Sequence, residues 1–327
     1  ANLLRRRGDR EQAELQYLES IRCNPAQAEA YHGLGSLFLE SGRFDAAESC
    51  LQKAVELSPG FVLALHDLGQ LFLLQGERAR SEEFFRRCLE FDAGFVPALN
   101  SLGMLLLRSN RLNEARDCFT NALRIQPDYL QARANLAVLS TWCGELEYAV
   151  RELTLLAELA PNDGDVHFNL SLALLASGCM AEGWQEHEWR FSKARPVECH
   201  HADIPRWQGE SLAGKRLLIH AQQGYGDSLQ FIRYAAILSG LGATVLVEAQ
   251  DRIIAPLLAT NPGVSAVFAR GETVPPADFQ IPMMSIPLPL GTAGWPPPQP
   301  PYLYALTDKV AVWRNRLLKL KGLKVGL

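Results

Sequence analysis

Residues 31–64 read YHGLGSLFLESGRFDAAESCLQKAVELSPGFVLA, and this stretch decides the fold because the chain repeats its pattern every 34 residues. A glycine inside a helix costs about 1 kcal/mol relative to alanine, so a recurring glycine indicates that two helices approach too closely for a side chain. A fixed period of this length predicts a solenoid of stacked helix pairs. The equivalent residue pairs are Leu34-Gly35, Leu68-Gly69, Leu102-Gly103, Leu136-Ala137 and Leu170-Ser171.

Further residue types recur in a fixed order within each unit. A turn residue ends the first helix, and a small residue lets the second helix cross it. Proline closes several units because it cannot continue a helix. One helix pair cannot bury its own apolar face, so stacking on the next pair supplies the core. The turn residues are Gly42, Gly76, Asn110, Gly144 and Gly178, and the small residues are Ala47, Ser81, Ala115, Ala149 and Gly183.

This pattern resembles the tetratricopeptide repeat family over residues 1 to about 191, with a first unit that lacks most of its first helix. The resemblance implies an α-helical solenoid that binds a protein or an extended peptide on a concave face lined by first helices. In sugar-transferring relatives an asparagine ladder at the sixth position of each unit holds a peptide backbone. Two interpretations stay open for this position: clamps on a peptide backbone, or a solvated polar face. Here the position is held by Gly33, Asp67, Ser101, Asn135 and Asn169.

The sixth unit departs from the repeat pattern. Its helix carries Trp184 and Trp189, with Phe191 following, which is more aromatic surface than a solvated terminal helix needs. We expect this helix to pack against whatever follows it.

Charge and cysteine usage narrow the function classes. Residues 1–190 carry 18 Lys and Arg against 27 Asp and Glu, whereas residues 191–327 carry 14 against 9. A net negative repeat block argues against nucleic-acid binding, which needs a dense basic face. Cys50, Cys88 and Cys118 fall at second-helix positions, as reduced, buried thiols of a cytoplasmic protein would. The longest uncharged stretch, 279–307, holds too many prolines for a membrane span.

From residue 216 the hydrophobic period changes. Residues 216–221, 243–248 and 264–269 read as strands, with helices expected over 227–239 and 251–259. This alternation predicts an α/β doubly wound, Rossmann-like parallel sheet. Ligands bind such sheets at the carboxyl ends of the strands, so the turn Gly224–Asp227 is expected in a site.

The turn Gly224-Tyr225-Gly226-Asp227, followed by a helix, resembles the N-terminal domain of GT-B glycosyltransferases of the lipopolysaccharide heptosyltransferase type. The segment from Trp207 onward is similar to bacterial proteins that fuse tetratricopeptide repeats to such a domain. The resemblance implies that Asp227 is the general base, deprotonating an acceptor hydroxyl for inverting, metal-independent transfer from a nucleotide-sugar. The substrate-binding residues that it implies are Gln223, Gly224, Tyr225, Gly226 and Arg233.

A second interpretation of Asp227 is that it only caps the helix that begins there. The helix dipole and free N–H groups at that position would also stabilise the carboxylate and lower its basicity. Both roles could hold at once.

Two other motifs are weaker. Gly224 and Gly226 with Glu248 match two parts of a dinucleotide fingerprint, but Leu229 stands where the third glycine should be. The run around His200 and His201 lacks a second ligand pair at a standard metal spacing, which favours a solvated linker and no metal site.

The patterns divide the chain into repeats over 1–191, a linker over 192–214, a Rossmann-like half of a GT-B domain with a proline-rich connector over 215–306, and a linking helix and strand over 307–327. The donor-binding domain would follow, so no cofactor is expected in this chain. We expect a protein-recognition arm plus the sugar-acceptor half of a glycosyltransferase, inert as it stands. The alternative is a non-enzymatic scaffold that binds peptides and carries a degenerate α/β domain.

Overall fold

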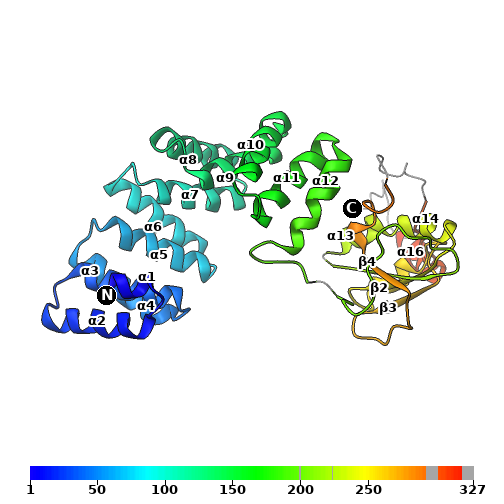
Figure 1. The fold of residues 1–327 in the computed structure, drawn as a ribbon, viewed down its shortest axis with the longest axis horizontal. Coiled ribbons are helices and arrows are strands. Elements are labelled where there is room, and N and C mark those ends of the chain that lie inside the picture. The colour runs from blue at the N-terminus through cyan, green and yellow to red at the C-terminus, as the bar shows by residue number, and fades with distance from the viewer. Residues whose placement is uncertain (199, 223, 292–300, 319–327) are drawn as a thin grey trace. The chain divides into compact units, whose positions relative to one another are not determined.

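The chain forms two compact units, residues 1–152 and 153–327, in a computed structural model that describes residues 1–198, 200–222, 224–291 and 301–318 (Figure 1). The first unit is helical, and the second combines helices with a parallel sheet. None of the helices in these ranges is long and apolar enough to cross a bilayer.

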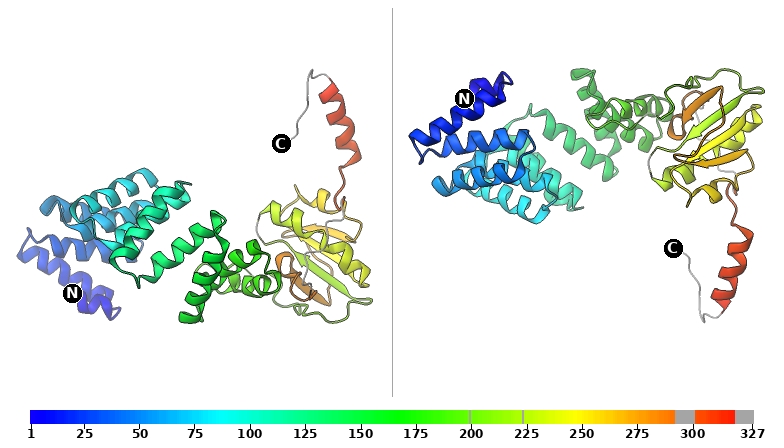
Figure 2. Two further views of the ribbon diagram at one scale, coloured as in Figure 1. Left: turned by 90° about the horizontal axis from the view of Figure 1, so that it is seen from above. Right: turned by 90° about the horizontal axis from the view of Figure 1, so that it is seen from below.

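The first unit is a series of helix pairs, seen from two further sides in Figure 2. From α3 to α8, each odd-numbered helix packs most extensively on the even-numbered helix that follows it. The predicted helical solenoid is therefore confirmed. The helices are α1 (Asn2–Arg6), α2 (Arg10–Cys23), α3 (Ala28–Glu40), α4 (Phe44–Leu57), α5 (Val62–Leu74), α6 (Arg78–Phe91), α7 (Val96–Arg108), α8 (Leu112–Ile125), α9 (Leu130–Trp142) and the start of α10 (Leu146–Leu159).

The recurring glycines lie where the sequence predicts a close helix crossing. A Cβ atom added to Gly69 would lie 2.4 Å from Cε1 of Phe85, and one on Gly103 would lie 2.5 Å from Cε1 of Phe119. Both rings are fully buried. The large apolar residue of each second helix thus fills the space that the glycine of the first helix leaves open.

Replacing Gly69 with alanine should therefore destabilise the first unit, even though alanine favours helices. The added methyl group forces the buried Phe85 ring to move, and overpacking of this kind costs about 1–3 kcal/mol. Urea unfolding followed by circular dichroism measures the loss. The control is Gly94→Ala, whose Cβ would meet only the carboxylate of Asp92, at 3.3 Å. Equal stability of the Gly69 variant and the natural chain would contradict the crossing argument.

The second unit joins the last repeat helices to a four-stranded sheet in which every strand pair is parallel. The strand order is β3-β2-β1-β4, so β4 lies on the opposite side of β1 from β2 and β3. The predicted parallel sheet is present. The elements are α11 (Gly164–Ser177), α12 (Met180–His187), η1 (Glu188–Phe191), β1 (Arg216–His220), α13 (Tyr225–Phe231), α14 (Tyr234–Gly240), β2 (Thr244–Ala249), α15 (Ala255–Leu258), β3 (Ala266–Ala269), β4 (Phe279–Pro282), η2 (Met283–Ser285) and α16 (Thr307–Leu318).

One face of the sheet forms the main core of this unit. Ile219 of β1 and Val247 of β2 are fully buried in one cluster with Tyr234 and Leu238 of α14. Successive strand residues point to opposite faces, so His220 and Glu248 lie on the other face.

The helices of the α/β part differ from their predicted lengths. The helix expected over 227–239 is divided into α13 and α14, and the buried side chain of Asn261 donates to the Ile232 carbonyl at the break (3.2 Å). The helix expected over 251–259 is only α15, because the Asp251 carboxylate accepts from the N–H groups of Ile253 (2.8 Å) and Ile254 (3.3 Å) and forms a turn there.

Strand β4 lies inside the stretch that was expected to be only a proline-rich connector. It pairs with β1 from Leu217↔Phe279 to His220↔Pro282. Proline at its last position leaves this short strand without a clear alternating pattern in the sequence.

Part of the segment expected to be a linker, residues 192–214, belongs to the fold. Trp207 and Leu212 are buried in the core of the sheet, and Arg206 pairs in parallel with Gln280 of β4. Trp207 and Leu212 stand among polar and small residues, so no helical or strand period indicates that this segment packs on the sheet. At the other end, α16 matches the linking helix expected within 307–327, whereas the strand expected to follow it lies outside the described residues.

Candidate functional site

The predicted groove residues of the first unit form bonds between neighbouring first helices. The carboxylate of Asp67 on α5 accepts from Ser36 Oγ (2.5 Å) and lies 3.0 Å from His32 Nε2, both on α3. One repeat later, Ser101 Oγ on α7 lies 3.2 Å from His66 Nε2 and 2.7 Å from Gln70 Nε2. The side chains at the sixth position of these units are therefore hydrogen-bonded to the first helix of the preceding repeat.

The same arrangement continues at the next repeat. Asn135 Nδ2 on α9 donates to Asn100 Oδ1 on α7 at 2.8 Å. Asn169, the remaining predicted groove residue, lies on α11 in the second unit. At Gly33 an added Cβ would lie 2.4 Å from the Tyr17 ring, so a side chain there is excluded by packing.

The Asp67 carboxylate is the most strongly perturbed acid of this face. Burial alone would raise its pKa, but the contacts with His32 and His66 and the hydrogen bond from Ser36 outweigh burial and hold the pKa well below the usual value. The group is therefore a charged acceptor that neighbouring repeats already satisfy.

Two recesses open beside these bonded side chains. One has a volume of about 230 Å³ and the other about 360 Å³. The smaller is lined by Gln70, Leu73, Asn100, Ser101, Met104, Leu105 and Arg108. The larger is lined by Asn2, Arg5, Glu29, His32, Gly33, Phe61 and Leu63. Each combines apolar side chains with amides or an arginine, a composition suited to a peptide.

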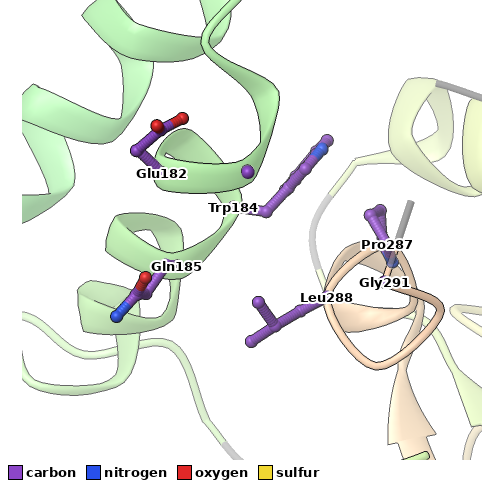
Figure 3. Close-up of a pocket in the computed structure, with 7 residues that line it drawn as sticks. Glu182, Trp184, Gln185, Pro287, Leu288 and Gly291 are labelled. Carbon is purple, nitrogen blue, oxygen red and sulfur yellow. The ribbon is translucent and has the colours of Figure 1, made fainter. Parts of the chain in front are cut away.

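In the second unit, the aromatic helix packs against the α/β part, as the sequence predicts. Trp184 of α12 is buried in the core of the sheet, and its ring lies edge-on to Phe231 of α13 at 5.6 Å. Figure 3 shows Trp184 and Leu288 projecting toward a space of about 420 Å³ between α12 and the segment that follows η2.

The carboxyl ends of β1 and β2 hold the predicted turn. Gly224 is the N-cap of α13, and its carbonyl accepts from Gln250 Nε2 at 3.0 Å. Gln250 also bonds to Ser228, and the Tyr225 hydroxyl donates to Asp251. The residues that follow β2 are thus hydrogen-bonded to the first turn of α13.

Asp227 lies in the first turn of α13, near the Gly224 N–H. Burial raises the pKa of Asp227 above its usual value, and the Gly224 N–H opposes this only in part. The helix end therefore lowers the basicity of Asp227, as the sequence predicts, but removal of the carboxylate from water raises its pKa by more.

The other predicted substrate residues are placed differently. Arg233 lies at the start of α14, where it donates to the Gln230 carbonyl (2.7 Å) and the Tyr302 hydroxyl (3.0 Å). Gly226 lies within α13, and an added Cβ there would meet nothing within 4 Å. Gln223 lies outside the described residues.

The sequence did not predict the contacts that several polar residues make at this edge. Buried Glu248 lies 3.2 Å from His201, and buried His220 Nε2 lies 2.8 Å from Gln280 Oε1. Burial lowers the pKa of His220 to about 4, although the hydrogen bond with Gln280 opposes this shift. Arg270, after β3, donates to the Ala221 carbonyl. No group of three metal-ligand side chains suited to an ion occurs in the parts of the chain that the structure describes.

A family comparison identifies the helical part of the chain. Tetratricopeptide repeat profiles match residues 1–60, 32–94 and 106–177. The chain therefore belongs, through its helical part, to the tetratricopeptide repeat proteins. The resemblance of the later residues to GT-B domains stays a prediction.

Protein FlbA of Caulobacter vibrioides is 36% identical over 121 residues, which are 35% of this chain and 20% of that protein. The chain spans about a fifth of the length of this curated relative.

Two solved structures are similar in fold. PilW, described as a type IV pilus biogenesis factor, is 16% identical with a TM-score of 0.51, over 56% of this chain and 85% of that one. A tetratricopeptide repeat protein from Parabacteroides merdae is 19% identical with a TM-score of 0.50, over 59% and 77%. At these identities the likeness shows the fold alone.

Proposed function

We propose that the repeat array is a protein-interaction scaffold whose first-helix face binds an extended peptide segment of a partner protein. The observation that carries this proposal is the recess between α5 and α7, where Gln70 and Asn100 lie beside Leu73 and Met104. Amide side chains can bond a peptide backbone on both its N–H and C=O groups.

The side chains around this recess can contact different parts of the peptide. Asn100 accepts from Asn135 with its carbonyl oxygen, which leaves the two N–H groups of its amide for two carbonyl groups of the peptide backbone. Leu73 and Met104 offer an apolar surface for one side chain of the peptide. The polar bonds between repeats keep the first helices in register, so the recess is formed before the peptide arrives.

Asn100→Ala should weaken peptide binding about tenfold, because two backbone hydrogen bonds of about 0.5–1.5 kcal/mol each are lost or left imperfect. Peptides selected from a displayed random library against the natural chain serve as probes, and calorimetric titration measures their affinity for each variant.

The matched control is Arg124→Ala, an exposed residue on second helix α8. Equal affinity of the natural chain and the Asn100 variant, or a larger loss in the Arg124 variant, would place the peptide elsewhere.

The α/β part is proposed as the sugar-acceptor half of a glycosyltransferase whose donor half lies outside this chain. The observation that favours this second function is Asp227 at the carboxyl edge of a parallel sheet, with its pKa raised by burial as a general base requires. Loss of sugar transfer on Asp227→Asn in a protein that carries both halves is the deciding result.

We further propose a reducing compartment, the cytoplasm, as the place of action. All six cysteines in the described ranges are free, and burial raises the pKa of Cys88 to about 12, so this thiol stays protonated.

A further inference from the structure

The strand order of the second unit indicates where a ligand crevice would open at the edge of its sheet. The chain runs from β1 to β2 and β3 on one side, and β4 lies on the other side of β1. In open parallel sheets the crevice for a ligand opens at the carboxyl ends of the two strands where the order reverses. Here these strands are β1 and β4, followed by Gln222 and by Ser285 of η2.

The side chain of Arg190 reaches both of these residues. Its Nη2 and Nε lie 3.1 and 3.3 Å from Gln222 Oε1, and Nη2 also donates to Ser285 Oγ. Arg190 belongs to η1, the turn that ends the repeat array, and its side chain is fully buried. The terminal repeat therefore supplies the group that joins the ends of β1 and β4.

The remaining donors of the same guanidinium face the repeat array. Nη1 donates to Glu188 Oε1 at 2.8 Å and to the His187 carbonyl at 3.1 Å. Glu188 Oε1 also accepts from Ser285 Oγ at 2.8 Å. A rigid planar cation bonded on both sides transmits a displacement of one side to the other.

Gln222 leads directly into the predicted site. Gly224, two residues on, is the N-cap of α13, and Asp227 lies in the first turn of the same helix. A shift of the backbone at Gln222 would therefore move the turn on which Asp227 stands.

We propose that Arg190 is a positioning residue through which the last repeat helix sets the conformation of the turn after β1. A ligand that moves α12 or η1 would then change the geometry around Asp227. The meaning for catalysis rests on the proposed transferase role of Asp227, whereas the coupling itself is a property of the chain alone.

Hydrogen exchange of the whole chain tests the coupling without any substrate. In Arg190→Met we expect amides of Gly224–Phe231 to exchange about tenfold faster, with strands β1 and β2 unchanged. Arg190→Lys should give a smaller increase, because a single ammonium group cannot bridge Gln222 and Ser285 as the planar guanidinium does. The control is Arg195→Met, an exposed arginine five residues further along.

Two results would overturn the proposal. Unchanged exchange in Gly224–Phe231 would show that the conformation of the turn does not depend on Arg190. Equally faster exchange throughout the sheet would show that Arg190 only stabilises the fold. If the methionine variant fails to fold, Gln222→Leu removes the link between Arg190 and the turn and must give the same local pattern. If the local exchange pattern is not observed, the proposed role of Asp227 is not contradicted, because hydrogen exchange does not depend on sugar transfer.

Discussion

Glu188→Ala is expected to lower the free energy of unfolding of the second unit by about 3–5 kcal/mol, because it leaves the buried Arg190 guanidinium without its counter-ion. Burial would raise the pKa of Glu188, but the charges and hydrogen bonds of Arg190, Arg206 and Ser285 outweigh burial and lower it. The natural pair is therefore ionised at neutral pH.

Urea unfolding followed by tryptophan fluorescence measures this loss, since Trp184 is buried in the same unit. Glu182→Ala removes an exposed carboxylate from α12, the helix just before η1, and should change stability by less than about 0.5 kcal/mol. A Glu188 variant as stable as the Glu182 control would show that groups other than Glu188 stabilise the charge of the buried Arg190 guanidinium.

Asp227→Asn should reduce sugar transfer at least about a hundredfold in a protein that carries the donor half as well, because the amide cannot accept the hydroxyl proton. The side chain keeps an oxygen that can accept from the Gly224 N–H, so the helix cap and the fold should survive.

Transfer to an added acceptor and thermal unfolding, measured together, separate the two roles of Asp227. Asp203→Asn is the control, because Asp203 is an exposed carboxylate of the same unit. Full activity in the Asp227 variant would leave this residue only its capping role.

The helical fold could be predicted because its signals are local and recur. The glycine of one helix and the ring that fills its place lie in the same unit of sequence, as Gly69 and Phe85 do, so the period alone identifies the contact. The turn residues with left-handed backbone also recur once in each unit, so they could be predicted as well. Asn110, at φ 59°, takes the place of a glycine.

The α/β part was predicted less completely because its contacts join distant residues. Arg190 bonds Ser285, and the buried pair of His220 and Gln280 joins β1 to β4. Nothing near these residues in the sequence indicates their partners. His201 was assigned to a solvated segment for the same reason, although it lies against buried Glu248.

The groove residues show a related limit. Their positions on the first helices were predictable, but the sequence left two roles open for Asp67 and Ser101: peptide clamp or solvated residue. Each is instead bonded to the preceding repeat, through contacts that span 31 to 35 residues. The candidates for peptide contact therefore shift to neighbours such as Asn100, which was not among the predicted residues.

The most direct test of the central claim, that the first-helix face binds peptide, is methyl NMR of the chain titrated with a selected peptide. The account predicts shifts at the methyl groups of Met104 and Leu73, which line the recess between α5 and α7. Shifts confined to second helices, such as at Leu123 of α8, with Met104 and Leu73 unmoved, would contradict it.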